Sequence, residues 1–366
     1  MKRNLAIDAL RGLMLVIMTI DHFGGALAEF TNESFGFVSA AGGFVFLSGL
    51  VAGLVYGRLV KGDMYSLRSR TSHRAMVIYL AHILIVLLFL AQVFTMPASA
   101  GLAKYQYLRT NPVEALLLAF CFLYQPASLG ILPMYVAFMF LLPYVLRKYE
   151  EGGAGVVLMG SGLLWFFAQL GVQEDIVGFV RQYVPMELGN FDVLAWQVFF
   201  VFGSWIGYTI VFKKSVQVEY NRILLVVACV LLVALYLLRH FDVGRIELSS
   251  LFNFEAATSR KHLGWLRLFN FAVIAYLVSW LMRTHEGIFK RLKWLVYLGQ
   301  HSLAVFWYHF LGIAVLRSVE LRTSLRWGKL HLVLTILLVF SLSIAAMVHG
   351  QFISIRRRRA TSFVPT

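Results

Sequence analysis

Apolar runs of membrane-spanning length recur along the whole sequence, and they limit the possible folds more than any other feature. Three clear examples are residues 76–93, 223–238 and 330–347. The hydrocarbon core of a bilayer requires about 20 helical residues, and a helix satisfies its own backbone hydrogen bonds in lipid. The chain is 60% hydrophobic and only 14% charged, which is more apolar surface than a water-soluble fold hides. We therefore expect an all-α, polytopic membrane helix bundle.

The lengths of the apolar runs predict about ten transmembrane helices. They lie near residues 5–23, 41–57, 76–96, 130–146, 154–171, 191–212, 221–239, 265–283, 294–316 and 330–348. With the amino terminus inside, about 20 lysines and arginines would face the cytoplasm and about 12 the opposite side. This excess predicts that both termini are cytoplasmic, and it explains the net charge of +15 without nucleic acid as a partner.

We expect one integral-membrane domain over residues 1–350, followed by a basic cytoplasmic tail over residues 351–366. The apolar stretch 113–128 contains a proline and is too short to span, which favours a re-entrant or interfacial helix. Cys121 and Cys229 lie in apolar runs, which predicts buried thiols. The sequence shows no metal-ligand set, nucleotide fingerprint or serine-hydrolase motif, so we predict neither a metal nor a bound cofactor.

The amino terminus has a second interpretation as a cleaved signal peptide. Two bases precede the first apolar run, and residues 26–28 (ALA) resemble a cleavage site. However, Asp8 and Arg11 interrupt the front of that run, and Asp21 and His22 lie between it and the site. These charges favour a retained first helix.

The same charges mark a candidate site. On a helix, Arg11 and His22 are separated by about 1100°, which is within about 20° of full turns, so they share a face about 16 Å apart. Asp8 is an i,i+3 neighbour of Arg11. In the predicted orientation Arg11 lies in the inner half of the membrane and His22 near the outer end. Ionisable residues within a membrane usually face a bundle interior or a water-filled cavity.

His22 is therefore a candidate general base, and the carboxylate of Asp21 could orient it or stabilise its charged form. Neighbouring side chains on a helix point about 100° apart, so these two need not touch. In the alternative interpretation, Asp8 and Arg11 are a packing pair, and Asp21 and His22 form a hydrated helix end.

Two further histidines lie inside predicted spans. His82 and His309 are secondary candidates, because a single histidine in an apolar helix is more often a hydrogen-bonded core residue than a catalyst. The glycine-rich segment 36–57 favours close helix packing. A polar path with a histidine base fits either an enzyme or a transporter.

Several motifs resemble the OpgC family, membrane proteins linked to succinylation of osmoregulated periplasmic glucans, within the broader acyltransferase-3-like group. They are IDALRG (7–12), IDH (20–22), FGF (35–37), FVFLSG (44–49), IYLAH (78–82), ILPMY (131–135), WQVFF (196–200) and LGQHSLAVF (298–306). The spacing from Arg11 to His22 is also similar to an arginine–histidine signature of the wider group.

The resemblance implies transfer of an acyl group, succinyl in the namesake case, from cytoplasmic acyl-CoA to a hydroxyl of a periplasmic or cell-envelope glycan. The protein would then be a multi-pass protein of the bacterial inner membrane, with the lipid bilayer, acyl-CoA and a glycan acceptor as its partners. His22 would remove the hydroxyl proton, with Asp21 orienting or charging it. Arg11 would contact the anionic donor or neutralise Asp8. The alternative function is a transporter or flippase for an anionic or acylated glycan precursor.

The chain departs from the family pattern at one position. The family typically has an acidic residue just before the FVFLSG run, where this sequence has Gly42. Loss of that carboxylate would alter the chemistry or the acceptor, or weaken the enzyme. A catalytically silent scaffold is a third interpretation.

Overall fold

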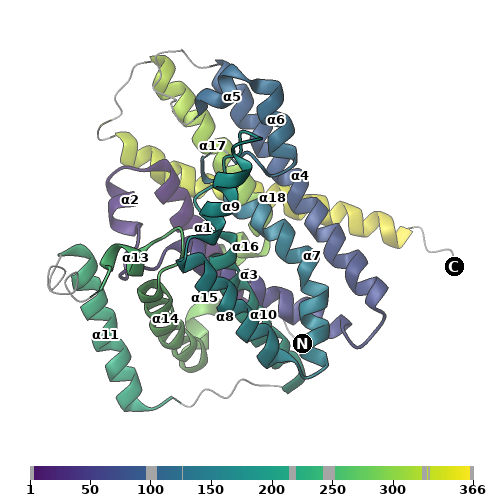
Figure 1. The fold of residues 1–366 in the computed structure, drawn as a ribbon, viewed down its shortest axis with the longest axis vertical. Helices are drawn as coiled ribbons and strands as arrows, with labels where there is room; N and C mark the ends of the chain where they lie inside the picture. Colours follow the sequence, from purple (N-terminus) through teal and green to yellow (C-terminus); the bar gives the residue numbers. More distant parts are fainter. Residues whose placement is uncertain are drawn as a thin grey trace. The chain divides into compact units, whose positions relative to one another are not determined.

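The computed structural model describes residues 4–95, 105–125, 127–213, 220–241, 252–323, 328 and 330–362. These ranges contain helices and no β-strand, apart from one isolated bridge between Tyr124 and Glu187 (Figure 1). The predicted all-α class is confirmed.

Eight described helices are long and apolar enough to cross a membrane. They are built on α3 (Ala40–Tyr56), α4 (Met64–Thr95), α7 (Ile131–Glu150), α10 (Val193–Lys213), α11 (Arg222–His240), α14 (Trp265–Thr284), α17 (Ser302–Thr323) and α18 (Leu330–Ser362). A ninth span results if α8 (Ala154–Gln169) and α9 (Val172–Val180), bent by 64°, are counted together. The protein is therefore a multi-pass membrane protein.

Of the ten predicted spans, 5–23 is absent from this count, and 154–171 is absent as well unless the bent pair is counted. Helix α1 (Leu5–Phe23) has 19 residues, which is close to the length of a membrane span. Three of these residues, Asp8, Arg11 and Asp21, carry charge. Its length therefore fits a span, whereas its charge does not fit a helix that faces lipid.

The predicted span 294–316 is not one helix. It is divided at His301 into α16 (Lys293–Gln300) and α17, and His301 has backbone angles of φ −110° and ψ 26°. The polar sequence Gly299-Gln300-His301-Ser302 lies at this break, and it contains residues of lower helix propensity than the flanking apolar segments. The short helices are α2 (Ala26–Thr31), α5 (Gln106–Thr110), α6 (Pro112–Phe120), α13 (Phe254–Thr258) and α15 (Glu286–Arg291).

The chain forms two compact units, one from residues 1–32 and 279–366, the other from residues 33–278. In the first unit, α1 packs against α16, α17 and α18. Ala6 and Ala9 contact an apolar cluster with Phe289 and Val296 near the start of α1. Helix α18 continues to Ser362, so the predicted basic tail begins as a helix.

In the second unit, α3 and α10 are packed backbone to backbone. A Cβ atom placed on Gly49, Gly53, Gly203 or Gly207 would lie between 2.1 and 2.3 Å from a backbone oxygen of the facing helix. No residue larger than glycine fits these positions without separating the helices. This is the close packing that the glycine-rich segment predicts.

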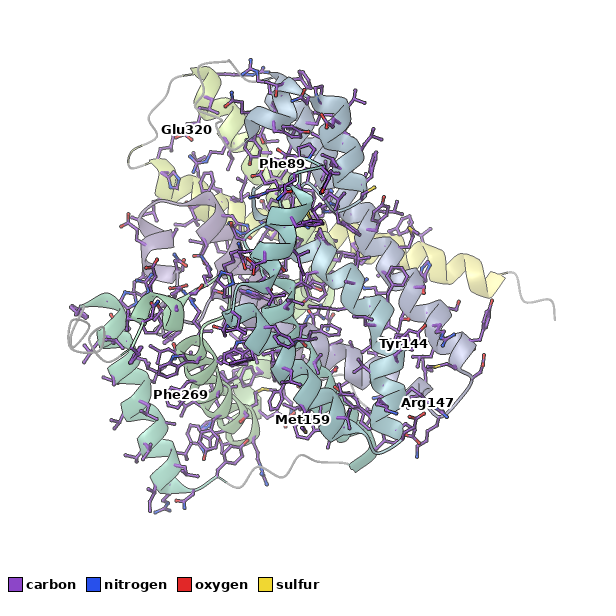
Figure 2. All side chains as sticks on the ribbon, viewed as in Figure 1. Phe89, Tyr144, Arg147, Met159, Phe269 and Glu320 are labelled. Carbon is purple, nitrogen blue, oxygen red and sulfur yellow. The ribbon has the colours of Figure 1, made fainter. Side chains whose placement is uncertain are left out.

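Apolar side chains cover much of the outer surface, as expected of a protein that faces lipid. Tyr144 on α7 and Met159 on α8 are examples, with 55% and 72% of their surface exposed (Figure 2). Cys121 and Cys229 are also exposed, so the prediction of buried thiols was wrong. Lipid surrounds a membrane helix with an apolar medium, and an apolar run therefore does not imply burial inside the protein.

Candidate active site

Helix α1 begins at a side-chain cap and is held against α16 through two glycines. The Asn4 side chain accepts hydrogen bonds from the N–H groups of Ala6 and Ile7, which satisfies two of the free donors at the helix start. A Cβ atom on Gly12 would lie 2.0 Å from the Leu295 carbonyl oxygen. One on Gly299 would lie 1.8 Å from the Asp8 carbonyl oxygen. The two backbones are therefore in direct contact beside the charged residues of α1.

Arg11 is anchored at the break between α16 and α17. Its Nη2 atom donates to the Oγ atom of Ser302 at 2.5 Å, and Ser302 is the first residue of α17. Ser302 and Asp8 are both buried. Because a guanidinium stays protonated in proteins, this contact places a permanent cation beside the break.

His22 and His309, which are 287 residues apart, form a pair. The Nδ1 atom of His22 lies 3.0 Å from the Nε2 atom of His309. The rings are stacked, with centroids 5.2 Å apart and planes inclined by 26°. One nitrogen donates and the other accepts, so the pair shares one proton. A primary and a secondary sequence candidate are thus brought into hydrogen-bond contact.

Aromatic side chains pack against the histidine pair. Only 1% of the surface of His309 is exposed. The Phe310 ring lies 4.1 Å from the His309 ring and 5.4 Å from the His22 ring, and Phe306 lies 5.0 Å from His309. These rings exclude water from His309, whereas His22 is partly exposed, and the low polarity around His309 strengthens its hydrogen bond to His22.

Asp21 is held by a residue of α2. The chain turns back after α1 at two glycines, Gly24 and Gly25, whose φ angles of 83° and 82° suit glycine best. The Oγ1 atom of Thr31, the last residue of α2, then donates to the Oδ1 atom of Asp21 at 2.7 Å. The predicted interaction of Asp21 with His22 stays a prediction.

The carboxyl end of α1 is capped by an arginine from α17. Arg317 donates through Nη2 to the carbonyl oxygen of Phe23 at 2.6 Å, and through Nη1 to Glu320 at 2.7 Å. A cation at the last turn of a helix is favourable because the free carbonyl groups carry partial negative charge. This contact connects α1 and α17 close to the histidine pair.

These helices belong to a region that a known family covers. A family model described as OpgC protein matches residues 3–353. The chain belongs to the OpgC family. The match includes α1, α16 and α17 in full, and hence Asp8, Arg11, Asp21, His22 and His309. No curated protein and no solved structure matches the sequence.

An aromatic ring lies beside Gly42, the position where the resemblance implies an acidic residue. A Cβ atom on Gly42 would lie 3.1 Å from the ring of Phe199, and that ring packs 4.4 Å from the ring of Phe271. The aromatic side chain thus occupies the space that an acidic side chain at residue 42 would enter. Restoring a glutamate there would also require Phe199 to move.

The remaining histidine candidate lies elsewhere. His82 is on α4, in the second unit, where it is fully buried and packs against Phe122 with ring centroids 5.4 Å apart. In the first unit, sequence reasoning missed a second histidine pair, in which the Nδ1 atoms of His301 and His349 lie 2.9 Å apart. The polar sequence at the break, which includes His301, is the feature that could have indicated this pair.

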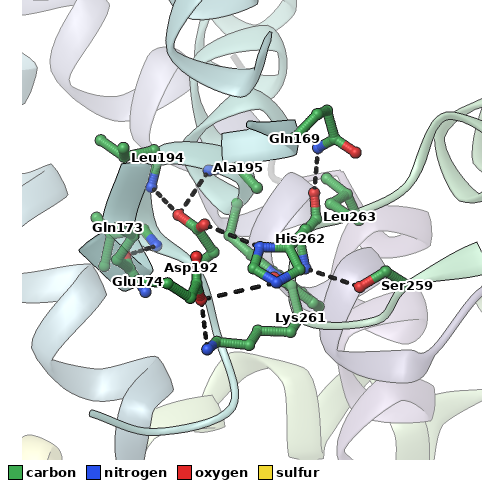
Figure 3. Close-up of polar contacts among 12 residues, drawn as sticks. Gln169, Gln173, Glu174, Asp192, Leu194, Ala195, Ser259, Lys261, His262 and Leu263 are labelled. Carbon is green, nitrogen blue, oxygen red and sulfur yellow. Dashed lines mark hydrogen bonds and ion pairs between the residues drawn. The ribbon is translucent and has the colours of Figure 1, made fainter. Parts of the chain in front are cut away.

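The second unit contains a polar cluster that sequence reasoning also missed (Figure 3). The Nδ1 atom of His262 lies 3.2 Å from Oδ2 of Asp192, and its Nε2 atom lies 3.6 Å from Oε1 of Glu174. Lys261 pairs with the same oxygen of Glu174. Asp192 is fully buried and its Oδ1 atom accepts from the N–H of Leu194 at the start of α10.

The donor atoms of Glu174, Asp192 and His262 lie within 4.8 Å of one another, close enough to be considered as a metal site. The geometry argues against that role. The imidazole presents a different nitrogen to each carboxylate, whereas one metal ion binds a single nitrogen of a ring. Lys261 also supplies the charge that would balance Glu174. The cluster therefore fits a clamp that fastens the 259–264 loop to α9 and α10.

Two aspartates at helix starts have opposite environments. Asp63, which is exposed, precedes α4 and accepts from the N–H groups of Tyr65 and Ser66, each at 3.0 Å. These hydrogen bonds lower the pKa of the Asp63 carboxyl. Asp192 precedes α10, and its burial raises its pKa although its hydrogen bonds act in the opposite direction.

Asp63→Asn and Asp192→Asn should therefore change the pH dependence of stability in opposite directions. The contribution of Asp63 is present above its unfolded pKa of about 3.9 and is lost as the pH falls through the lower folded pKa. The contribution linked to Asp192 is present at low pH and is lost as the pH rises through the raised folded pKa. Melting midpoints of the purified proteins between roughly pH 3 and 7 test this. Parallel profiles for the two variants would contradict it.

Proposed function

We propose that this OpgC-family protein is an integral O-acyltransferase of the bacterial inner membrane. It transfers an acyl group, succinyl or a similar one, from acyl-CoA to a hydroxyl of a periplasmic or cell-envelope glycan. The observation that carries the proposal is the hydrogen bond between His22 on α1, the helix that also holds Arg11, and His309 on α17. A base with a buried partner and a fixed cation suit attack of a hydroxyl on a thioester.

The pair supplies the base. When Nδ1–H of His22 donates to Nε2 of His309, the lone pair of His22 resides on Nε2. That nitrogen accepts the proton of the acceptor hydroxyl while the hydroxyl oxygen attacks the thioester carbonyl carbon. The new C–O bond forms, the C–S bond breaks, and the thiolate of coenzyme A takes the proton from the imidazolium. The products are an ester and a free thiol, and His22 is neutral again.

His309 and Arg11 have supporting roles in this scheme. His309 holds one tautomer of His22 and stabilises the imidazolium through the shared hydrogen bond, as a partner to a catalytic histidine does. The guanidinium of Arg11, fixed by Ser302, attracts the negative charge of the donor. Asp8 beside it keeps the net charge of this part of the membrane low.

The test compares glycans from cells that carry wild-type protein, no protein, or His22→Ala. Mass spectrometry should show exported glycan without its acyl mass increment in both the deletion and His22→Ala cells. His285→Ala, which removes an exposed histidine of the first unit, should retain full acylation. Glycan retained inside the deletion cells would support the transporter instead. Full acylation in His22→Ala cells with normally inserted protein would refute the assignment of the base.

A further inference from the structure

The second unit contains a buried carboxylate among three arginines. Glu33 has only 4% of its side chain exposed. Its Oε1 atom lies 2.6 Å from Nη1 of Arg267 and 3.9 Å from Nε of Arg260, and its Oε2 atom lies 3.0 Å from Nε of Arg239. Among the described residues, these three guanidinium groups share this one carboxylate, so the four side chains together have a net positive charge.

Hydrogen bonds of Arg267 fix this cluster, although the backbone at Glu33 is strained. Glu33 has a φ angle of 59°, a left-handed conformation that is unfavourable for a non-glycine residue. Arg267 is buried and is fixed by the carbonyl oxygens of Thr258, at 2.6 Å, and Phe37. The guanidinium of Arg267 is therefore already oriented before any ligand arrives, which lowers the entropic cost of binding.

A pocket opens beside the cluster. Its volume is about 180 Å³, compared with roughly 30 Å³ for one water molecule in the liquid. It is lined by Glu33, Phe37, Leu238, Arg239, Phe254, Thr258 and Arg267. The pocket is thus lined by guanidinium and hydroxyl groups and by apolar rings. This lining suits a ligand in which an anionic group is attached to a larger, partly apolar body such as a sugar ring.

We propose that this pocket binds an anionic group, a carboxylate or a phosphate, of the glycan acceptor. This inference rests on the proposed function and adds to it that the acceptor is an anionic glycan. Arginine recognises both anions through paired N–H groups. Glu33 acts as an internal counter-ion that keeps the arginines paired until the ligand arrives. In the predicted orientation the pocket faces the periplasm, where the acceptor resides.

Binding is tested on the full chain, purified in neutral detergent, by the shift in melting midpoint with added inorganic phosphate or succinate. Both anions should give a saturable rise, whereas neutral glucose oligomers alone should not. Arg239→Gln should weaken the apparent affinity about tenfold or more, equivalent to about 1.4 kcal/mol. The control Arg181→Gln removes an exposed arginine outside the pocket and should leave the affinity unchanged.

Glu33→Gln gives the sharper result. Loss of the internal counter-ion should lower the midpoint without anions, yet raise the affinity for phosphate and restore the midpoint when phosphate is added. A purely structural ion pair would give the lower midpoint with no restoration. Either that result or equal phosphate binding by wild type and Arg239→Gln would overturn the proposal.

A second arm separates a soluble anion from a lipid headgroup. Micelles that contain phosphatidylglycerol should stabilise wild type and Arg239→Gln equally. If the lipid raises the melting midpoint of wild type only and soluble phosphate does not change it, the pocket binds a lipid headgroup. That result would contradict the assignment of the pocket to a glycan. None of these readouts depends on acyl transfer, so the pocket and the function of His22 can fail independently.

Discussion

Adding His309→Phe to a His22→Ala protein should not reduce acyl transfer further, although His309→Phe alone should reduce it about tenfold or more. His22→Ala alone should cost about 10²–10⁴-fold, the usual contribution of general base catalysis. If His309 acts only through the hydrogen bond to His22 at 3.0 Å, its loss has no effect once His22 is gone. Initial rates of acyl transfer by the four reconstituted proteins give this double-mutant cycle.

His309→Gln is the matched control for the cycle, because glutamine retains a hydrogen-bonding group near the position of the Nε2 atom. It should recover part of the rate lost in His309→Phe and shift the pH profile of kcat, neither of which a packing role would produce. Rate losses that multiply in the double variant would show that the two histidines act separately.

Gly299→Ala should produce the largest loss of stability among single-methyl changes in the first unit. The new Cβ atom would lie 1.8 Å from the carbonyl oxygen of Asp8, so α1 and α16 must separate. Overpacking of this kind costs about 1–3 kcal/mol. Acyl transfer should fall as well, because the separation moves Arg11 away from Ser302.

The melting midpoint in detergent and the initial rate measure these two effects. Gly160→Ala is the control, since nothing lies within 4 Å of a Cβ atom at that position of α8 and alanine favours a helix. Its midpoint should equal or slightly exceed that of wild type. A Gly299→Ala protein as stable as Gly160→Ala would show that the two helices are not in backbone contact.

Hydropathy and charge were sufficient to predict the helical membrane fold, and they single out α1 as the candidate functional helix. The face shared by Arg11 and His22 follows from helical periodicity alone. The partners of these residues did not follow, because contacts across hundreds of residues depend on tertiary packing. His309 was therefore only a secondary candidate and Ser302 was not predicted.

Two other features depended on local details that a hydropathy profile averages out. The break at His301 was hidden because the flanking segments are both apolar enough to extend one span. Phe199 beside Gly42 could not be predicted, since the two residues are 157 positions apart in the sequence and meet only where α3 packs on α10. The resemblance implies an acid at residue 42, and the structure places the Phe199 ring beside Gly42.

The break between α16 and α17 also has a consequence for the role of α1. The first N–H groups of α17 and the last carbonyl groups of α16 lack partners within their own helices. In hydrocarbon such groups are tolerated only where protein covers them or where they line a water-filled cavity. Leu298, Gly299 and Ser302 at this break are buried, so protein covers these polar groups, and Arg11 on α1 supplies one of the covering side chains. Helix α1 therefore shields the polar backbone of the break from lipid.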